Sequence, residues 1–235
     1  MASKLPDMLE VASLDHLDEP VRRYFRHALR LPMKAGVSTR LTMAGRIRVR
    51  SWLRFTATWE GDAMSFVWRA RAGRLGLRPF TVVDRYEAGA GSMDVRLLGR
   101  LPLVTAEDED TSRSAAGRTA VEAACWAPAS LLPGGGVSWD AEGEHHIVAR
   151  WRIPPEEPQV RIEIDERGAV RSVSVMRWDG GQQGRRGYVP FGGRVLAERR
   201  FGDLLLPSRL SVGWRFGGPC WEPFFEADVL TAESF

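Results

Sequence analysis

The sequence has few of the residues from which metal centres and nucleophilic active sites are built. Its 235 residues include two cysteines and four histidines. Cys125 and Cys220 lie far apart, with no metal-ligand spacing and no neighbouring histidine. The adjacent His145 and His146 would point to opposite faces of a strand, so they cannot easily share one ion. We therefore expect no metal, and whether the cysteines pair stays open.

Lysine is equally scarce, because Lys4 and Lys34 are the only two in the chain. This nearly excludes a Schiff-base lysine, and the phosphate-loop motif G-x-x-x-x-G-K-[ST] is absent. The serine motif G-x-S-x-G is also missing, and the glycines at 89 and 91 have no dinucleotide-binding pattern around them. We expect no cofactor.

Long apolar runs are absent too. No stretch approaches the 18 apolar residues or so that a transmembrane helix needs. Residues 1–10 lack the basic and apolar parts of a secretion signal, so the expected location is cytoplasmic. No repeat, linker or domain boundary is visible, and we expect residues 1–235 to form a single domain.

Positive charge is modest in total, although the pI is about 9.2. The formal net charge is +3, and the basic residues are almost all arginine. Nucleic-acid binding, which needs a clustered basic face, is not expected. The nearest candidate is a set of arginines on one face of a predicted strand, which indicates a solvated face or a guarded edge and leaves open an acidic partner or lipid head groups. They are Arg46, Arg48, Arg50 and Arg54.

What the chain does have is alternation of apolar and polar residues, the mark of strands with one dry face. It begins in residues 46–59, which form one long bent strand or two strands joined by a bulge. A turn at Gly61 leads into a hairpin partner at 64–71. About ten such strands, mostly joined by short turns, predict an antiparallel meander. The fold class is thus α+β, mostly antiparallel β, as a curved sheet or half-barrel.

Two segments have helical character instead. Residues 17–30 place Val21, Phe25 and Leu29 on one face, after an acid and a proline suited to a first turn. Residues 112–132 are rich in alanine, follow an acidic run and end at Pro133. We expect an N-terminal helix and a central helix, the latter packed on the concave face of the sheet.

Several short motifs, in order, resemble an uncharacterised family of bacterial domains of unknown function over roughly residues 17–230. The matching segments are 19–24, 55–57, 66–71, 84–86, 89–91, 126–128 and 131–132, with Glu122, Trp139, Pro207 and Trp214. The resemblance implies an architecture similar to the half-barrel of bacterial lipoprotein carriers, with an apolar concave face. It supplies no catalytic residues. Residues 117–124 are smaller here than in the family, which predicts more room between helix and sheet.

Three charged residues are the candidates for chemistry. Asp84 shares the parity of Phe80, Val82 and Tyr86, so a regular strand would turn it to the apolar side. Such an acid must be paired or have a raised pKa, and it is either a general acid or base or half of a structural ion pair. Arg118 and Glu122 lie one helical turn apart and face the same way, forming a polar pair in a cavity or a surface pair.

Aromatic residues supply the candidate ligand-binding wall. Trp126 is one further turn from Glu122 on the same helical stripe, and Trp68, Tyr86 and Trp151 are expected on the opposite wall. Any of the nine tryptophans could equally be core.

These features leave three functions open. The first is binding of an apolar small molecule or lipid in an aromatic-lined cavity. The second is a cofactor-independent cyclase, isomerase or hydrolase acting on an apolar substrate, such as a natural product, with Asp84, Glu122 and Arg118 in the active site. The third is a structural or oligomerising domain. The sequence does not fix the ligand or the oligomeric state.

Overall fold

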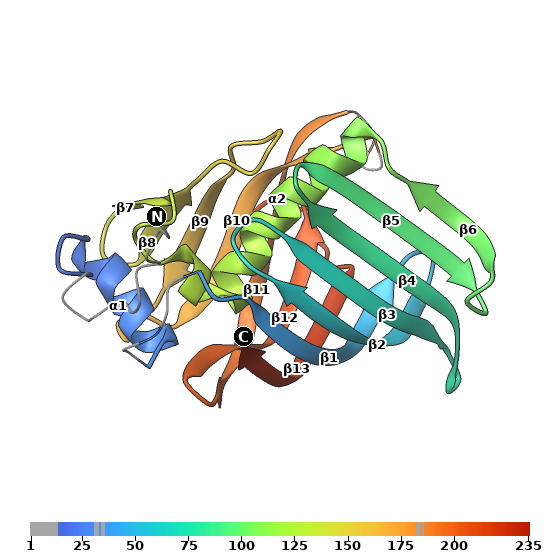
Figure 1. Cartoon of the computed structure of the whole chain (residues 1–235), viewed down its shortest axis with the longest axis horizontal. Helices are drawn as coiled ribbons and strands as arrows, with labels where there is room; N and C mark the ends of the chain where they lie inside the picture. Colours follow the sequence, from blue (N-terminus) through green and yellow to red (C-terminus); the bar gives the residue numbers. More distant parts are fainter. Residues whose placement is uncertain (1–13, 31–32, 34–35, 182–183, 185) are drawn as a thin grey trace, which may run out of the picture.

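The computed structural model describes residues 14–30, 33, 36–181, 184 and 186–235. Its strands form a single antiparallel sheet in the order β6-β5-β4-β3-β2-β1-β13-β12-β11-β10-β9-β8-β7. The strands are β1 (Thr39–Arg48), β2 (Trp52–Gly61), β3 (Phe66–Arg74), β4 (Leu77–Glu87), β5 (Ala90–Leu97), β6 (Leu101–Ala106), β7 (Ser138–Ala141), β8 (His146–Arg150), β9 (Gln159–Ile164), β10 (Val170–Asp179), β11 (Gly187–Phe201), β12 (Leu204–Trp214) and β13 (Phe225–Ser234). The sheet curves around a central helix (Figure 1). The predicted fold class is confirmed.

The sheet has 13 strands rather than about ten, and it does not close into a barrel, because β6 and β7 are its two edges. Part of the difference lies in two strands that alternation does not reveal. β7 has only 4 residues, and apolar and polar residues do not alternate in β6. The stretch 46–59 belongs to two antiparallel strands, β1 and β2, rather than to one bent strand. Ile47 pairs with Leu53 across their turn, so the predicted parity still holds.

The N-terminal helix α1 (Glu19–Ala28) is shorter than the predicted 17–30. It begins with Pro20 in its first turn and buries Val21, Tyr24 and Phe25. It ends because Leu29 takes extended geometry and forms a bridge with Leu204 of β12. The Tyr24 hydroxyl donates to the carbonyl oxygen of Ala124 at 2.9 Å, which fixes α1 to the central helix.

The central helix α2 (Glu109–Trp126) begins and ends earlier than the predicted 112–132. Asp108 caps it by accepting from the Thr111 backbone N–H at 2.8 Å. Pro128 lacks an N–H and disfavours helical geometry at the residue before it, so the α-helix stops and a 3₁₀ turn (Pro128–Leu131) follows. Figure 1 shows α2 crossing the hollow of the sheet, where it packs against β4, β5 and β10.

Register assigns the side chains of the concave face, which we define as the face that carries α2. Asp84 of β4 contacts α2, and residues two apart or directly paired across strands share its face. Near α2 this face carries the covered region: Trp59, Phe66, Trp68, Asp84 and Tyr86. Farther along the same strands lies the open region: Leu53, Phe80, Val82, Val95 and Leu97. Members of the open region are half-exposed, whereas Trp59 and Tyr86 are buried.

Candidate functional site

A charged network occupies the covered region and contains the three predicted charged residues. Arg118 of α2 donates from Nε to Glu122 Oε1 at 2.6 Å and from Nη1 to Asp84 Oδ2. Trp59 donates from Nε1 to the other oxygen, Glu122 Oε2, at 2.7 Å. All three charged side chains are 15% exposed. The structure therefore brings Asp84, Arg118 and Glu122 together, and it adds Trp59.

The electrostatics of this network are those of a satisfied ion pair. Burial acts to lower the pKa of Arg118, but the adjacent Glu122 and Asp84 carboxylates outweigh it and raise the pKa above its ordinary value. Both oxygens of Glu122 accept a hydrogen bond. The bonds join α2 to β2 and β4, so one consequence of the network is the position of the helix on the sheet.

The four predicted ligand-binding aromatic residues are all buried. Trp126 packs edge-on against Trp59 with ring centroids 5.5 Å apart, and Trp68 packs edge-on against Phe55 at 5.7 Å. The indole N–H groups of Trp68 and Trp126 are buried with no acceptor among the described residues. Direct contact between these aromatic side chains and a ligand stays a prediction.

The other two aromatic residues hold distant strands together. The Tyr86 hydroxyl donates to the carbonyl oxygen of Pro154, and Trp151 Nε1 donates to that of Ala63 at 2.8 Å. Trp151 follows β8, so these bonds tie the turn between β2 and β3, and the end of β4, to the segment before β9. Tyr86 and Trp151 thus close one end of the half-barrel around α2.

Beyond α2 the same face is apolar and accessible. Val82 pairs with Val95, and Phe80 pairs with Leu97, so their side chains form adjacent rows. The rows extend to the edge strand β6, where Val104 is 46% exposed and Leu101 is 57% exposed. Alanines at 57, 70 and 72, on the neighbouring strands β2 and β3, are buried beside these rows. The half-exposed side chains of the open region form a shallow apolar floor.

A second arginine reaches the concave face from the opposite side of the half-barrel. Arg177 of β10 shares the parity of Val173 and Val175, and its Nε donates to the Ser114 carbonyl oxygen of α2 at 2.9 Å. Its guanidinium carbon lies 4.5 Å from the ring centre of Phe191 and 4.9 Å from that of Trp214. Burial, and then the charge of Arg118, lower the pKa of Arg177 to about 10.

Arg177 also occupies the room that the small residues of α2 leave. A Cβ on Gly117 would lie 3.0 Å from Cγ of Arg177, so a larger side chain at 117 would displace the arginine. The predicted space between helix and sheet is filled here by this arginine stem. The sequence reasoning missed Arg177, although it breaks the apolar parity of its strand in the same way as Asp84.

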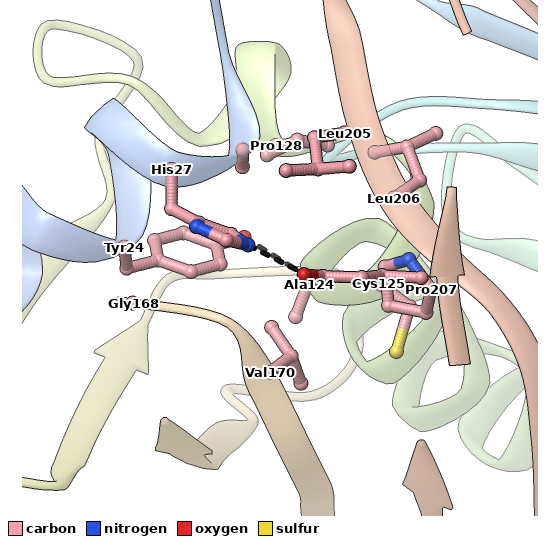
Figure 2. A pocket seen from close by; sticks show the side chains of 12 residues that line it. Tyr24, His27, Ala124, Cys125, Pro128, Gly168, Val170, Leu205, Leu206 and Pro207 are labelled. Atoms are coloured by element: carbon pink, nitrogen blue, oxygen red, sulfur yellow. Dashed lines mark hydrogen bonds and ion pairs between the residues drawn. The ribbon is translucent and has the colours of Figure 1, made fainter. Parts of the chain in front are cut away.

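Two cavities lie elsewhere. A small one, about 10 Å³, is bounded by Tyr24 and His27 of α1 on one side and by Leu206 and Pro207 of β12 on the other (Figure 2). This volume holds no more than about one water molecule. An open cleft of about 790 Å³ lies along β10 and the segment 155–159 and reaches α2 at Gly117.

Polar groups in the cleft bind one another. Arg113 donates from Nε to Glu156 Oε1 at 2.5 Å and from Nη2 to the Tyr188 hydroxyl at 2.8 Å. The guanidinium lies 3.5 Å from the ring centre of Trp178. The cleft is of ligand size, and it is formed largely by residues that the sequence did not single out.

Among the described residues, no group of histidine, cysteine or acidic side chains is arranged to hold a metal ion. Both cysteines are free, with Cys125 buried and Cys220 exposed, which answers the question of pairing. Within the described part of the chain, no helix combines the length and apolarity that a membrane span requires. Arg46, Arg48 and Arg54 have the opposite parity to the concave face, and Arg50 lies in the turn between β1 and β2. Arg46 binds Glu226 and Arg48 binds Glu222, both at 2.6 Å.

Fold and site together define an open antiparallel half-barrel with a helix across its concave face. The model of a family of unknown function, DUF6544, matches residues 7–227, so the chain belongs to this family. The resemblance found in the sequence is thereby confirmed. Comparison with curated proteins gives no match.

Three solved structures share the overall chain path at low identity. A domain assigned to outer membrane lipoprotein sorting, from Vibrio parahaemolyticus, has a TM-score of 0.47 at 8% identity, covering 85% of both chains. A DUF1329 family protein from Desulfovibrio piger has a TM-score of 0.46 at 9% identity, covering 94% of this chain and 91% of that one. A LolA superfamily protein from Nitrosomonas europaea has a TM-score of 0.45 at 9% identity, covering 91% of each. Identity this low transfers neither a ligand nor an activity to this chain.

Proposed function

We propose that the protein binds an apolar small molecule or lipid on the open region of its concave face. The observation that carries the proposal is the contiguous floor made by Leu53, Phe80, Val82, Val95 and Leu97, which α2 leaves half-exposed. Each Å² of apolar surface that a ligand removes from water contributes about 25 cal/mol. A rigid sheet presents this surface without reorganisation, which limits the entropy lost on binding.

Strong anchors lie on one side of the floor, which supports a binding role. At the closed end Tyr86 and Trp151 link distant strands, and at the border Arg118 joins α2 to β4. These contacts keep the strands curved, so an apolar chain lying along β4 and β5 would contact side chains from several strands at once. Exposed apolar patches of this kind mark sites of interaction in monomeric proteins.

The enzyme alternative rests on Asp84, Glu122 and Arg118, and their geometry favours it less. Each of these groups already bonds another member of the network. A general acid or base must instead be able to reach a substrate proton. Binding without chemistry is therefore the function we propose, and the network's contribution is to hold the site in shape.

The test uses two matched substitutions on β4. Val82→Asn places a polar amide on the open region, whereas Val83→Asn places the same group on the outer face, where Val83 is 38% exposed. We expect wild type and V83N to bind lauryl alcohol in isothermal titration calorimetry, and V82N to bind it about tenfold more weakly, because the amide disrupts an apolar contact surface.

A third variant separates this floor from the open cleft along β10 and the segment 155–159, which we call the outer cleft. Met176 lines the cleft and is exposed, so Met176→Asn should leave binding of lauryl alcohol unchanged. If M176N loses the ligand and V82N keeps it, the site is the cleft and the proposal is wrong. Native mass spectrometry of protein purified from its own host complements the titration, since a stoichiometric apolar molecule released on denaturation would identify the ligand class.

A further inference from the structure

A cation with no carboxylate hydrogen-bond partner among the described residues lies on the same concave face as the apolar floor, on β10. Among the described residues Arg177 forms no ion pair, and its one hydrogen bond runs from Nε to the Ser114 carbonyl oxygen. Within the described part of the chain neither Nη group donates a hydrogen bond, so both are able to donate to a ligand. A guanidinium is rarely left this way in an apolar setting, because burying a charge is costly unless it is paired.

Arg118, another arginine at the concave face, is paired with carboxylates, whereas none of the described carboxylates accepts a hydrogen bond from Arg177. Arg118 bonds two carboxylates and also lies 5.4 Å from the ring centre of Trp68. The Arg177 guanidinium lies against the rings of Phe191 and Trp214 and donates to a carbonyl oxygen. Both are close to α2, yet only Arg177 keeps its Nη fork available.

Register places Arg177 and the open region on one continuous surface. Val175 pairs with Phe191, which pairs with Trp214. Two residues before Trp214 on β12, Val212 pairs with Phe225 of β13. Phe225 pairs with Ile47 of β1, and Ile47 pairs with Leu53 of the open region. Phe225 also stacks on Phe55, with ring centroids 5.1 Å apart. Half-buried and aromatic side chains therefore run without a polar break from Arg177 to the floor.

We infer that Arg177 binds the anionic head group of an amphiphile, a carboxylate, whose apolar chain lies on the open region. This inference rests on the proposed function and names its ligand class. The Nη groups of a guanidinium match the two oxygens of a carboxylate in parallel hydrogen bonds. The rings of Phe191 and Trp214 hold the guanidinium plane in place.

The surrounding charges favour a single negative charge on the ligand. Asp84, Glu122 and Asp179 are close enough to act on Arg177, as is Arg118. Asp84 and Glu122 share Arg118, and Asp179 has a partner of its own. A dianionic phosphate would add a second negative charge beside these carboxylates, so it suits the site less well than a carboxylate.

The experiment compares laurate, lauryl alcohol and lauryl phosphate in calorimetric titrations of the full chain. We expect wild type to bind laurate about tenfold or more tightly than lauryl alcohol, the scale of a hydrogen bond to a charged group. In Arg177→Met, which keeps an apolar stem, the ratio of the two affinities should fall to about one. Arg177→Lys keeps the charge without the fork and should retain an intermediate ratio.

Arg113→Met is the matched control, because Arg113 belongs to the outer cleft, and it should keep the full preference for laurate. Equal affinity of wild type for laurate and lauryl alcohol would overturn the assignment of Arg177 while leaving the proposed function intact. Tighter binding of lauryl phosphate than of laurate would overturn the carboxylate assignment. If wild type binds none of the three, the proposed function itself fails. If R177M does not fold, the ratio of the affinities of R177K for laurate and lauryl alcohol decides. A ratio equal to that of wild type would contradict the role of the two Nη groups.

Discussion

The covered and open regions of the concave face lie on the same strands but differ in how they are completed. On β4, Asp84 is bonded to α2 and Tyr86 to Pro154, whereas Phe80 and Val82, four and two residues before Asp84, remain half-exposed. Both regions obey the same alternation. The difference arises from where the helix crosses the sheet, and it separates a part of the molecule that holds the fold from a part that is free to hold a ligand.

The largest expected difference between the regions is in the cost of removing an aromatic ring. Phe66 of the covered region is 1% exposed, so Phe66→Ala should lower the free energy of unfolding by about 4 kcal/mol through lost burial and a cavity. Phe80→Ala in the open region should cost about 1 to 2 kcal/mol, because Phe80 is only partly buried. Urea unfolding measures both, and equal costs would show that the regions do not differ in packing.

The next effect is at the border between the regions. Arg118→Met leaves Asp84 and Glu122 with no cation in the network, and we expect a loss of about 3 kcal/mol in the free energy of unfolding. Adding Asp84→Asn and Glu122→Gln to this variant should recover part of the loss, because no unpaired charge remains. Arg96→Met breaks the exposed pair with Asp94 and should leave the free energy of unfolding nearly unchanged, because water screens an exposed pair. A comparable loss in R118M and R96M would mean that the network contributes no more than a surface pair.

A smaller effect is expected at the closed end. Tyr86→Phe removes the hydrogen bond to Pro154 and should cost about 1 kcal/mol, with no change in binding of lauryl alcohol. Burial raises the pKa of Tyr86 to about 12, above the value of 10 in an unfolded chain. The folded state therefore holds this proton more tightly, so stability is full below pH 10 and falls as the pH rises from 10 to 12. Y86F should show a shallower fall over that window in unfolding measured against pH.

The mildest test uses the two thiols. Burial, reinforced by the charge of Glu122, raises the pKa of Cys125 to about 12, while Cys220 is exposed. At pH 8 a disulfide reagent should label one thiol quickly and the second only when urea unfolds the chain, since the thiolate is the reactive form. Rapid labelling of both thiols in the folded protein would contradict the tight packing of α2 against α1 and β12 around Cys125.

Alternation and helical spacing were sufficient to predict much of this arrangement. The parity of Asp84 with Phe80 and Val82 placed it on the concave face, and the four-residue spacing of Arg118, Glu122 and Trp126 placed them on one side of α2. The pairing of Asp84 with Arg118 could only be named as one possibility, because 34 residues separate them and the meeting depends on where α2 crosses the sheet. Trp59, the donor to Glu122, carries no local signal that distinguishes it from other strand tryptophans.

Other features depend on tertiary structure alone. The extent of the open region follows from the length and tilt of α2, and neither is encoded in the strands that form the floor. Arg177 was within reach of the reasoning, since it follows Val173 and Val175 at the apolar parity, as Asp84 follows Val82. The C-terminal end of α2 lies before the predicted one because the alanine-rich composition continues past Pro128, while the proline itself ends the α-helix.

The central claim is that a ligand lies on the open region, and amide chemical-shift mapping by NMR during titration with laurate tests it most directly. The account predicts shifts concentrated on β2 to β5 next to Phe80, Val82, Val95 and Leu97, continuing along β11 to β13 toward Arg177, with the amides around Glu156 and Tyr188 of the outer cleft unchanged. Shifts confined to the outer cleft, or an unchanged spectrum at saturating laurate, would contradict it.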